Sequence, residues 1–507
     1  MVHLKKLAMH CYMGIDIGTS GCKAVVFDDN GEQLAAAYRE YDILSEKEGW
    51  AELDTDEVIE KCFQVIRESA TAITPGMVSG IGISSQGEAF TIIDHRGKAR
   101  CNAFVSSDTR AKEYVTHWTK EFGEGKLYQI TGHTSHPMFS LFKLLWVKDY
   151  MPDIWQEAYK ILCFEDLLEY RLGINDPAIG WSLAGRTMLF DVVRHCWSNE
   201  ILEKAGIKTS QLSRPLQSGS VAGYVEKDIA RQLNLSEQTF VVTGGHDQPC
   251  SALGAGTVRP GMAVFASGTV ECITPAFEIP VFNEELRRNN YCTYDHAVNG
   301  LYATVAFNLT GGNLLRWFRD EFGQREREIA DRTKSDPYQL LLDQMPAQPT
   351  NLLVLPYFTS SGTPYFDTSV KGAVLGLKLS TKRGEVLKAL LEGLAFEMKL
   401  NLEILEKAGY KVNELTAIGG GAKSSVMNQL RADIINRPIA TIDTTEAGCQ
   451  GVAMLAKAAH TLEDIDDIVE EWISPASIFR PRNPDFYHER FQQFKKIYHL
   501  LKQGIAI

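Results

Sequence analysis

Two hydroxyl-rich glycine turns in this sequence carry the groups needed to hold phosphate. In the first, Asp16 ends an apolar run, Gly18-Thr19-Ser20-Gly21 follows, and Lys23 comes two residues later. Amides of such a turn can bind phosphate oxygens, the carboxylate can bind hydrated Mg²⁺, and the lysine adds positive charge. A Gly-rich hairpin without a ligand is the alternative for this segment alone. A matching turn, Ser267-Gly268-Thr269, lies in the other half of the chain, and the pair suggests a phosphate chain held from both sides of a cleft.

Two further segments suit phosphoryl transfer and nucleotide binding. The apolar run before Gly244-Gly245 leads to Asp247, whose carboxylate can accept the proton of a substrate hydroxyl. A simple turn aspartate is the alternative, and we interpret His246 as structural. The segment 419–424, Gly-Gly-Gly-Ala-Lys-Ser, precedes a predicted helix, where close backbone approach suits a nucleotide. It is neither a P-loop, because Ala422 replaces the required glycine, nor a Rossmann turn.

The elements that must position these residues follow from apolar periodicity and turn residues. Tyr12–Asp16 and Ala24–Phe27 are predicted strands of a hairpin, and residues 33–38 supply a third strand. Asp54 is expected to cap the next helix, with Glu57 as its capping-box partner. Strands followed by alternating helices and strands indicate an α/β layered domain.

The second half of the chain repeats this order. Residues 262–266 and 271–275 again form a strand, a glycine turn and a strand, which suggests an internal duplication with its seam at Gly254–Gly261. Helices are expected at 385–409 and 424–435. A terminal helix at 486–502 is predicted to pack on the body rather than form a tail.

Composition excludes several classes of protein. The 507 residues carry a formal net charge of −12, which argues against nucleic acid or an anionic membrane as the main partner. Ten widely spaced cysteines form no zinc pattern, so we expect free thiols in a reducing cytoplasm. The apolar stretch within Met1–His10 is too short for a signal-peptide core. No run approaches the length of a membrane span.

Together these segments resemble the FGGY carbohydrate kinases, within the superfamily of actin-like and hexokinase-like ATPases. Residues 138–149 look like the first family signature, although Tyr150 departs from its usual polar ending, and residues 372–392 look like the second. The resemblance covers about residues 12–500. It implies an α/β fold of two duplicated actin-like (ribonuclease H-like) domains around a deep cleft, with a sugar-binding domain at 12–256 and a mainly ATP-binding domain at 257–507.

The resemblance also implies roles for individual residues. Asp247 matches the family's catalytic base, and Asp16, together with Asp247, would organise Mg²⁺. The positions that match the ATP-binding segments are Gly18, Thr19, Ser20, Lys23, Gly268, Thr269, Gly312, Gly420, Gly421, Ala422 and Ser425. The ligands implied are ATP, Mg²⁺ and a sugar or polyol, and homodimers are common in this family.

The acceptor site departs from the better-known members. Gly87 stands where glycerol kinases carry arginine, Ser106 where the family usually has tryptophan, and Met138 where glycerol kinases offer tyrosine. These losses disfavour glycerol and make room for a pentulose, hexulose or deoxy-ketose. Candidate acceptor contacts are Gln86, Glu88, Asp108 and Gln248.

Two other functions stay open at this point. Segment 317–320 resembles that of quorum-signal kinases, which also lack the tryptophan, so an autoinducer-type dihydroxy-ketone is an alternative acceptor. A non-catalytic actin-like ATP-binding regulator is the alternative from another class. It would need no carboxylate at position 247.

Overall fold

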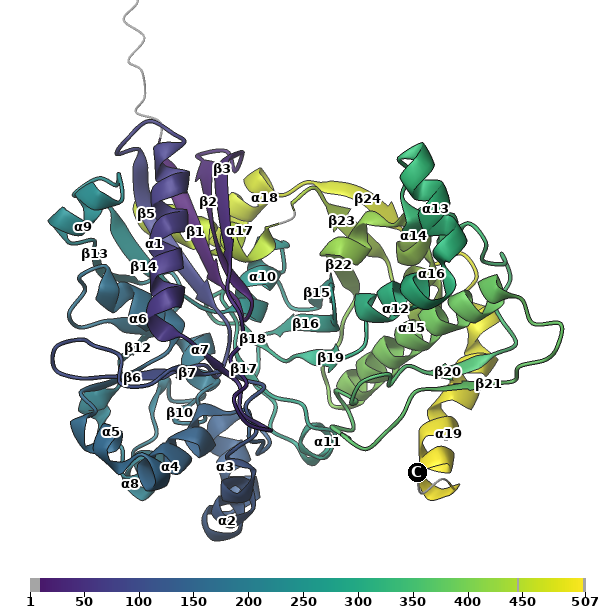
Figure 1. The fold of residues 1–507 in the computed structure, drawn as a ribbon, viewed down its shortest axis with the longest axis horizontal. Coiled ribbons are helices and arrows are strands. Elements are labelled where there is room, and N and C mark those ends of the chain that lie inside the picture. The colour runs from purple at the N-terminus through teal and green to yellow at the C-terminus, as the bar shows by residue number, and fades with distance from the viewer. Residues whose placement is uncertain (1–9, 445, 505–507) are drawn as a thin grey trace, which may run out of the picture.

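The computed structural model describes residues 10–444 and 446–504 (Figure 1). The predicted absence of a signal peptide concerns a segment of which residues 1–9 lie outside the described part. Within the described ranges, no helix is both long and apolar enough to cross a bilayer. All ten cysteines are free thiols, as expected.

The N-terminal half forms a mixed sheet in the order β13–β14–β5–β1–β2–β3. Strands β1 and β2 form the predicted hairpin, β3 extends it in antiparallel orientation, and β5 and β14 continue the sheet in parallel to β1. The sheet consists of β1 (Cys11–Ile17), β2 (Gly21–Asp28), β3 (Gln33–Glu40), β5 (Val78–Ser85), β13 (Val221–Tyr224) and β14 (Phe240–His246).

The remaining elements of this half cover and extend the sheet. Its helices are α1 (Thr55–Thr71), α2 (Lys112–Phe122), α3 (Glu124–Thr131), α4 (Ser140–Tyr150), α5 (Pro152–Glu157), α6 (Phe164–Arg171), α7 (Trp181–Gly185), α8 (Asn199–Ala205), α9 (Lys227–Gln232) and α10 (Asp247–Gly254). Its short strands are β4 (Glu52–Leu53), β6 (Thr91–Ile93), β7 (Ala103–Phe104), β8 (Lys160–Leu162), β9 (Ala178–Gly180), β10 (Phe190–Asp191), β11 (Cys196–Trp197) and β12 (Arg214–Leu216).

The C-terminal half repeats the same strand arrangement, which confirms the predicted duplication. Here β15 and β16 form the hairpin, β19 pairs with β16 in antiparallel orientation, and β22 and β23 follow in parallel to β15. Strand β24 closes the edge in antiparallel orientation, as β13 does in the first sheet. The strands of this sheet are β15 (Met262–Ser267), β16 (Glu271–Phe277), β17 (Tyr294–Asp295), β18 (Tyr302–Ala303), β19 (Ala306–Asn308), β22 (Glu414–Ile418), β23 (Ile439–Ile442) and β24 (Pro475–Phe479).

Helices of the C-terminal half include the two predicted between residues 385 and 435. The helices are α11 (Glu284–Arg288), α12 (Gly312–Phe322), α13 (Gln324–Thr333), α14 (Pro337–Leu342), α15 (Arg383–Lys407), α16 (Ser425–Ile435), α17 (Ala447–Thr461), α18 (Ile465–Trp472) and α19 (His488–Gly504), and β20 (Leu353–Leu355) pairs with β21 (Ala373–Leu375). Helix α19 docks as predicted, because buried Phe491 and Phe494 pack on Phe396 of α15. Burying each such ring contributes about 1.5–3 kcal/mol.

Helix α17 crosses back from the C-terminal half of the chain to the N-terminal sheet (Figure 1). Its residues Cys449 and Val452 join a core cluster with Tyr12 and Phe27. A Cβ at Gly14 of β1 would lie only 1.8 Å from the carbonyl oxygen of Cys449, so glycine is required for this approach. Although α17 comes late in the chain, it therefore belongs structurally to the first half.

Candidate active site

A cavity of about 420 Å³ lies between the two halves of the chain. Its walls are Thr19, Gln86, Gly87, Glu88, Ser106, His133, Thr134, His136, Met138, Phe139, Arg186, His246, Asp247 and Gln248 from the first half, and Val270, Cys272, Asn290, Cys292, Val305, Phe307 and Phe366 from the second. We call this space the acceptor cavity. It contains three of the four predicted acceptor contacts as well as Asp247.

Strand register brings Asp16 and Asp247 to the same edge of the first sheet. Asp16 pairs with Ser84 of β5, and Ser85 of β5 pairs with His246 of β14, directly before Asp247. Burial, followed by the charge of Asp16, raises the pKa of Asp247 to about 7. The Asp247 side chain keeps 28% of its surface accessible, so a ligand in the cavity can reach this carboxylate.

The glycines before Asp247 are needed for packing. A Cβ at Gly244 would lie 2.1 Å from the carbonyl oxygen of Ile83, and one at Gly245 would lie 2.0 Å from Ser182 Oγ. Gly245 also adopts a positive φ of 130°, which disfavours other residues. Close packing of β14 against β5 and α7 therefore sets the position at which α10 begins with Asp247.

His246 holds Asp247 from the side. Its Nδ1 lies 2.9 Å from the Tyr294 hydroxyl, and its Nε2 lies 3.2 Å from Asp247 Oδ1. Burial and the charge of Arg186 keep the pKa of His246 well below 6.5, so the ring is neutral. The neutral ring can hydrogen-bond to the Tyr294 hydroxyl through Nδ1, while its Nε2 stays in polar contact with Asp247. Our interpretation of His246 as only structural is incomplete, because the side chain lines the cavity.

The first glycine turn is held by Gln86. The Thr19 hydroxyl donates to Gln86 Oε1 at 3.1 Å, and Gln86 Nε2 donates to the carbonyl oxygen of Gly18 at 3.0 Å. Ser20 lies exposed at the tip of this turn. Lys23, predicted to supply charge toward phosphate, forms a 2.5 Å ion pair with Glu446 at the start of α17.

The second glycine turn, between β15 and β16, meets the N-terminus of α12. The Gly312 amide donates to the carbonyl oxygen of Gly268 at 2.9 Å, and the Asn313 amide donates to that of Thr269 at 3.3 Å. A Cβ at Gly312 would lie 2.5 Å from Gly268 O. These first amides of α12 are satisfied by the protein, and they fix the β15–β16 turn against the start of the helix.

The third predicted nucleotide segment packs on this same turn. A Cβ at Gly421 would lie 2.1 Å from Ser267 Oγ. Arg431 of α16, which sequence analysis missed, donates to Ser267 Oγ at 2.6 Å and to Glu271 at 2.5 Å. This buried arginine holds the β15–β16 turn and the 420–423 turn together. No local motif marks it.

Two glycines leave room for a ligand beside these turns. Among the described atoms, none lies within 4 Å of the place that a Cβ would take at Gly268 or at Gly420. Ala422 lies in the same short turn as Gly420, and Ser425 begins α16. The predicted nucleotide residues of the second half are therefore brought together around open space.

Glu88 adopts a left-handed conformation, with φ of 62°. Its carbonyl oxygen accepts hydrogen bonds from Ser140 Oγ at 3.0 Å and from Lys143 Nζ at 3.1 Å, both on α4 within the first family signature. Strained backbone of this kind persists where the surroundings over-determine it. Its carboxylate forms a buried ion pair with Arg186, which sequence analysis did not single out.

Gly87 does not leave the empty space that its sequence context predicts. A Cβ at this position would lie 2.9 Å from the His246 ring and 3.4 Å from Arg186 Nε. The space opened by glycine is thus occupied by two polar side chains from elsewhere in the fold. Ser106 and Met138 do line the cavity, as predicted.

Asp108 is not an acceptor contact, which corrects the prediction. It is fully buried, does not line the acceptor cavity, and accepts hydrogen bonds from Arg110 and from the amide of Ala51. These partners satisfy its carboxylate, so Asp108 fixes the loop that carries Ser106. Two unpredicted residues, His133 and His136, line the cavity instead. Burial lowers the pKa of both, that of His136 to about 4, so both rings are neutral.

Two lobes with matching glycine turns, and a carboxylate pair between them, define a phosphotransferase of the duplicated actin-like class. The family model described as the FGGY family of carbohydrate kinases matches residues 11–254 with its N-terminal domain and 263–460 with its C-terminal domain. The chain belongs to this family and is a carbohydrate kinase.

Similar proteins agree with this assignment. The xylulose kinase of Bacillus subtilis is 28% identical over 502 residues, covering 97% of each chain. The autoinducer-2 kinase of Yersinia enterocolitica is 28% identical over 499 residues, covering 96% of this chain and 92% of that protein. The crystal structure of gluconate kinase from Lactobacillus acidophilus shares the fold, with a TM-score of 0.89, 24% identity, and coverage of 98% and 99%. With membership of a kinase family, the alternative of a non-catalytic regulator is not retained.

Proposed function

We propose that this kinase transfers the γ-phosphoryl group of ATP to a primary hydroxyl of a ketose, such as a pentulose or deoxy-hexulose, or of a related polyol. The observation that carries the proposal is Asp247, a partly buried carboxylate that borders the acceptor cavity at the sheet edge shared with Asp16. A carboxylate in this place serves the acceptor hydroxyl. Binding of ATP alone would not require it.

Asp247 acts as the general base. Its raised pKa, about 7, matches a group that takes a proton near neutral pH. Gln248 Nε2 donates to Asp247 Oδ1, and His246 Nε2 lies 3.2 Å from the same oxygen, which leaves Oδ2 to accept the proton of the sugar hydroxyl. Positioning of the two substrates supplies most of the remaining rate.

Asp16 and Asp247 are the residues that would hold Mg²⁺. Within the described residues no group of three or more His, Cys, Asp or Glu side chains could hold a metal ion. Two carboxylates fit a magnesium ion that takes its remaining ligands from water and phosphate oxygens. When bound, the ion neutralises phosphate charge. Ser84 Oγ donates to Asp16 Oδ1 at 2.8 Å and orients that carboxylate.

The cavity walls suit an uncharged, hydroxyl-rich acceptor. The His136 ring, kept neutral by burial, accepts the Met138 amide at Nδ1 and presents Nε2 as a donor to the acceptor. Neutral His133 and His246 use both ring nitrogens in contacts with protein groups and add no charge to the wall. Arg186 is neutralised by Glu88, so the cavity offers no unpaired arginine to an acidic sugar. A volume of about 420 Å³ is generous for a triol and in the range of small-molecule sites. A ketose therefore fits these walls better than glycerol or an aldonate.

A dihydroxy-ketone of the autoinducer type is the second candidate, supported by the similarity to the Yersinia autoinducer-2 kinase. The segment 317–320, which suggested this acceptor, does not line the acceptor cavity. The cavity walls themselves favour the ketose.

An ADP-release screen tests the proposal. The acceptors are D-xylulose, D-ribulose, a deoxy-hexulose, a branched dihydroxy-ketone, glycerol and gluconate. We expect stimulation by at least one ketose, and a loss of about three orders of magnitude in kcat for Asp247→Asn. Asp153→Asn, which removes an exposed carboxylate on α5, is the matched control and should keep full activity.

Two results would contradict the proposal. Ketose-stimulated turnover that survives Asp247→Asn would show that Asp247 is not the base. Stimulation by glycerol or gluconate, with no response to any ketose, would show that the acceptor class is wrong. Thermal unfolding of both variants confirms that losses do not come from misfolding.

A further inference from the structure

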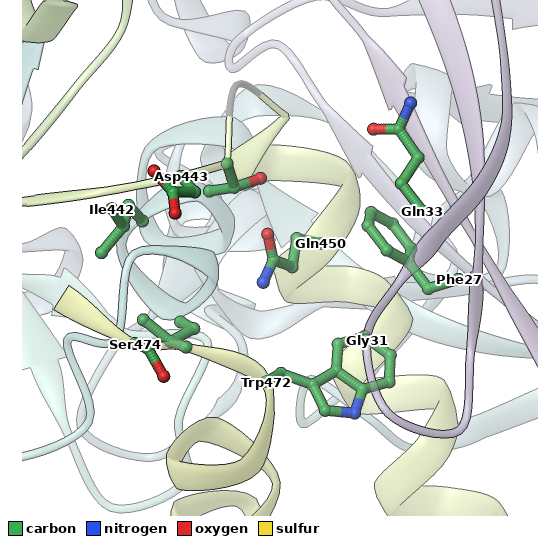
Figure 2. Close-up of a pocket in the computed structure, with 10 residues that line it drawn as sticks. Phe27, Gly31, Gln33, Ile442, Asp443, Gln450, Trp472 and Ser474 are labelled. Atoms are coloured by element: carbon green, nitrogen blue, oxygen red, sulfur yellow. The ribbon is translucent and has the colours of Figure 1, made fainter. Parts of the chain in front are cut away.

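A second cavity, of about 300 Å³, lies at the seam between the two halves and shares no residue with the acceptor cavity. Figure 2 shows it enclosed by the β2–β3 hairpin, the end of β23, the first turn of α17 and the segment after α18. We call it the seam cavity. One wall of the seam cavity comes from the first sheet (Phe27 and Gln33) and another from the second sheet (Ile442). Its shape therefore depends on the position of one lobe relative to the other.

Gln450 is the most informative residue of the seam cavity. It is only 4% exposed and lines the cavity, and Figure 2 shows its amide pointing into it. Among the described residues, the Gln450 side chain has no hydrogen-bond partner. The amide atoms are not among the fully enclosed unsatisfied groups of the described residues, so water or a ligand in the cavity can reach them and supply their hydrogen bonds.

The other walls define the chemistry of such a ligand. Asp443, Thr444 and Ser474 offer oxygen atoms, and Phe27 and Trp472 supply an apolar floor. No lysine, arginine or histidine occurs among the described lining residues, so nothing would neutralise a phosphate or carboxylate. Hydroxyl groups over an apolar carbon skeleton match these walls, and the cavity has the size of a small-molecule site.

The first turn of α17 connects the seam cavity to the catalytic residues. Two positions before Gln450, a Cβ at Gly448 would lie 3.3 Å from the carboxylate of Asp16. Glu446, at the start of the same turn, pairs with Lys23 at 2.5 Å. A ligand that holds Gln450 would therefore restrict the backbone against which Asp16 packs.

We propose that the seam cavity is a regulatory site for a small uncharged polyhydroxylated molecule, of monosaccharide size, whose binding orders the first turn of α17. A ligand that contacts both lobes favours the lobe arrangement it fits best, and it shifts the population toward that state. This site is separate from the phosphoryl-transfer site and requires only that the fold described above is present.

Direct binding tests the proposal without relying on catalysis. Binding of D-xylose, D-ribose and myo-inositol to the protein is followed by saturation-transfer NMR and calorimetry, with gluconate and glycerol 3-phosphate as charged probes. Binding in the acceptor cavity is told apart because it does not respond to changes at Gln450, which lies outside that cavity. We expect at least one uncharged probe to bind. Gln450→Met, a substitution of similar shape, should weaken its affinity at least about tenfold, and so should Asp443→Ala.

Hydrogen exchange of the unmodified protein gives a second readout that does not depend on the folding of these variants. The uncharged probe that binds should slow amide exchange in residues 446–452 and in the β2–β3 hairpin, and gluconate should not. The proposal is overturned if no uncharged probe binds, if Gln450→Met leaves the affinity unchanged, or if exchange in both segments stays the same. Because none of these measurements requires phosphoryl transfer, failure of the kinase proposal would not alter them.

Discussion

Arg186 forms a buried ion pair with Glu88 at the wall of the acceptor cavity, although the two residues lie 98 positions apart in the sequence. The guanidinium also lies 3.1 Å from His133 Nε2 and over the Phe139 ring. Gly87 lies beside it, where an added Cβ would be 3.4 Å from Arg186 Nε. The arginine that glycerol kinases carry at the position of Gly87 is thus replaced by one that arrives from the end of α7.

Arg186→Met should damage acceptor binding more than folding. Without its partner, Glu88 becomes an unpaired carboxylate at the cavity wall, an arrangement that costs about 3–5 kcal/mol when burial is complete. Because Glu88 can partly turn toward the cavity, we expect a loss of about 10²-fold in kcat/KM for the ketose, chiefly through a higher KM. Steady-state kinetics measure this.

Arg186→Lys is the control for charge. It keeps the ion pair but not the forked guanidinium, so it should recover part of the lost kcat/KM. If Met and Lys variants behave alike, or if KM for the ketose is unchanged in both, Arg186 does not shape the acceptor site.

Gly87→Ala should slow turnover with little effect on stability. The new Cβ would lie 2.9 Å from the His246 ring, and pushing that ring away removes its 3.2 Å contact with Asp247 Oδ1. We expect kcat to fall about tenfold, the cost of roughly 1.4 kcal/mol in the transition state. Gly87→Arg should act more strongly and also narrow the range of acceptors.

Gly125→Ala is the matched control for this substitution. Gly125 lies in α3, and no described atom lies within 4 Å of its Cβ position. Alanine there should leave kcat unchanged and raise stability slightly, by up to about 1 kcal/mol. A Gly87→Ala enzyme with full kcat and an unchanged acceptor profile would contradict the role given to His246.

Lys143→Met should reduce activity through the backbone of Glu88. Lys143 is fully buried and donates to the carbonyl oxygens of Glu88 and Val105. Its hydrogen bond to Glu88 stabilises the left-handed backbone conformation of that residue. Its loss should lower kcat/KM by about 10²-fold and lower stability by about 1–3 kcal/mol. Lys148→Met, on the same helix, is a control outside the cavity and should lose stability without a comparable loss of activity. Equal kinetic effects of both variants would contradict this.

Glu165→Gln should change the pH dependence of stability. Both carboxyl oxygens of Glu165 accept backbone hydrogen bonds, one from the amide of Gly180 and one from the amide of Gly244, three residues before Asp247. Burial raises the pKa of Glu165 from 4.5 to about 8 in the folded state. The folded protein therefore binds this proton more tightly, and the stability it brings is complete below pH 4.5 and is lost as pH rises toward 8.

Chemical unfolding at pH 6 and pH 8 measures this effect. The wild-type free energy of unfolding should fall by up to about 1.4 kcal/mol per pH unit more than that of Glu165→Gln. The glutamine variant should be the less stable of the two at pH 6, because its amide nitrogen cannot accept from glycine. Glu203→Gln, an exposed residue of α8, should follow the wild type. Parallel pH profiles for wild type and Glu165→Gln would contradict the raised pKa.

Local signals in the sequence predicted much of this molecule. The β1–β2 and β15–β16 hairpins, the 420–423 turn and helices α15, α16 and α19 follow from glycine turns and apolar periodicity, which act over a few residues. The same signals place Asp16, Thr19, Asp247 and Gly268 at strand ends. Since parallel strands align their carboxyl ends, nearness of Asp16 and Asp247 also follows from the predicted topology. The predicted capping box is only half formed. Asp54 caps α1, but the Glu57 side chain pairs with Lys61 and does not return to the backbone of Asp54.

The tertiary structure alone decided which side chains face the acceptor. It brought Arg186 and His133 to the cavity and Tyr294 against His246, satisfied Asp108 with the amide of Ala51, paired Lys23 with Glu446, and returned α17 to the first sheet. Each of these contacts joins residues through packing or through buried charge rather than through a repeating local pattern. Burial makes an unpaired charge costly, so the partners of Glu88, Asp108 and Lys23 depend on the whole fold. Turns and strands, by contrast, are determined largely by residues that are neighbours in the sequence.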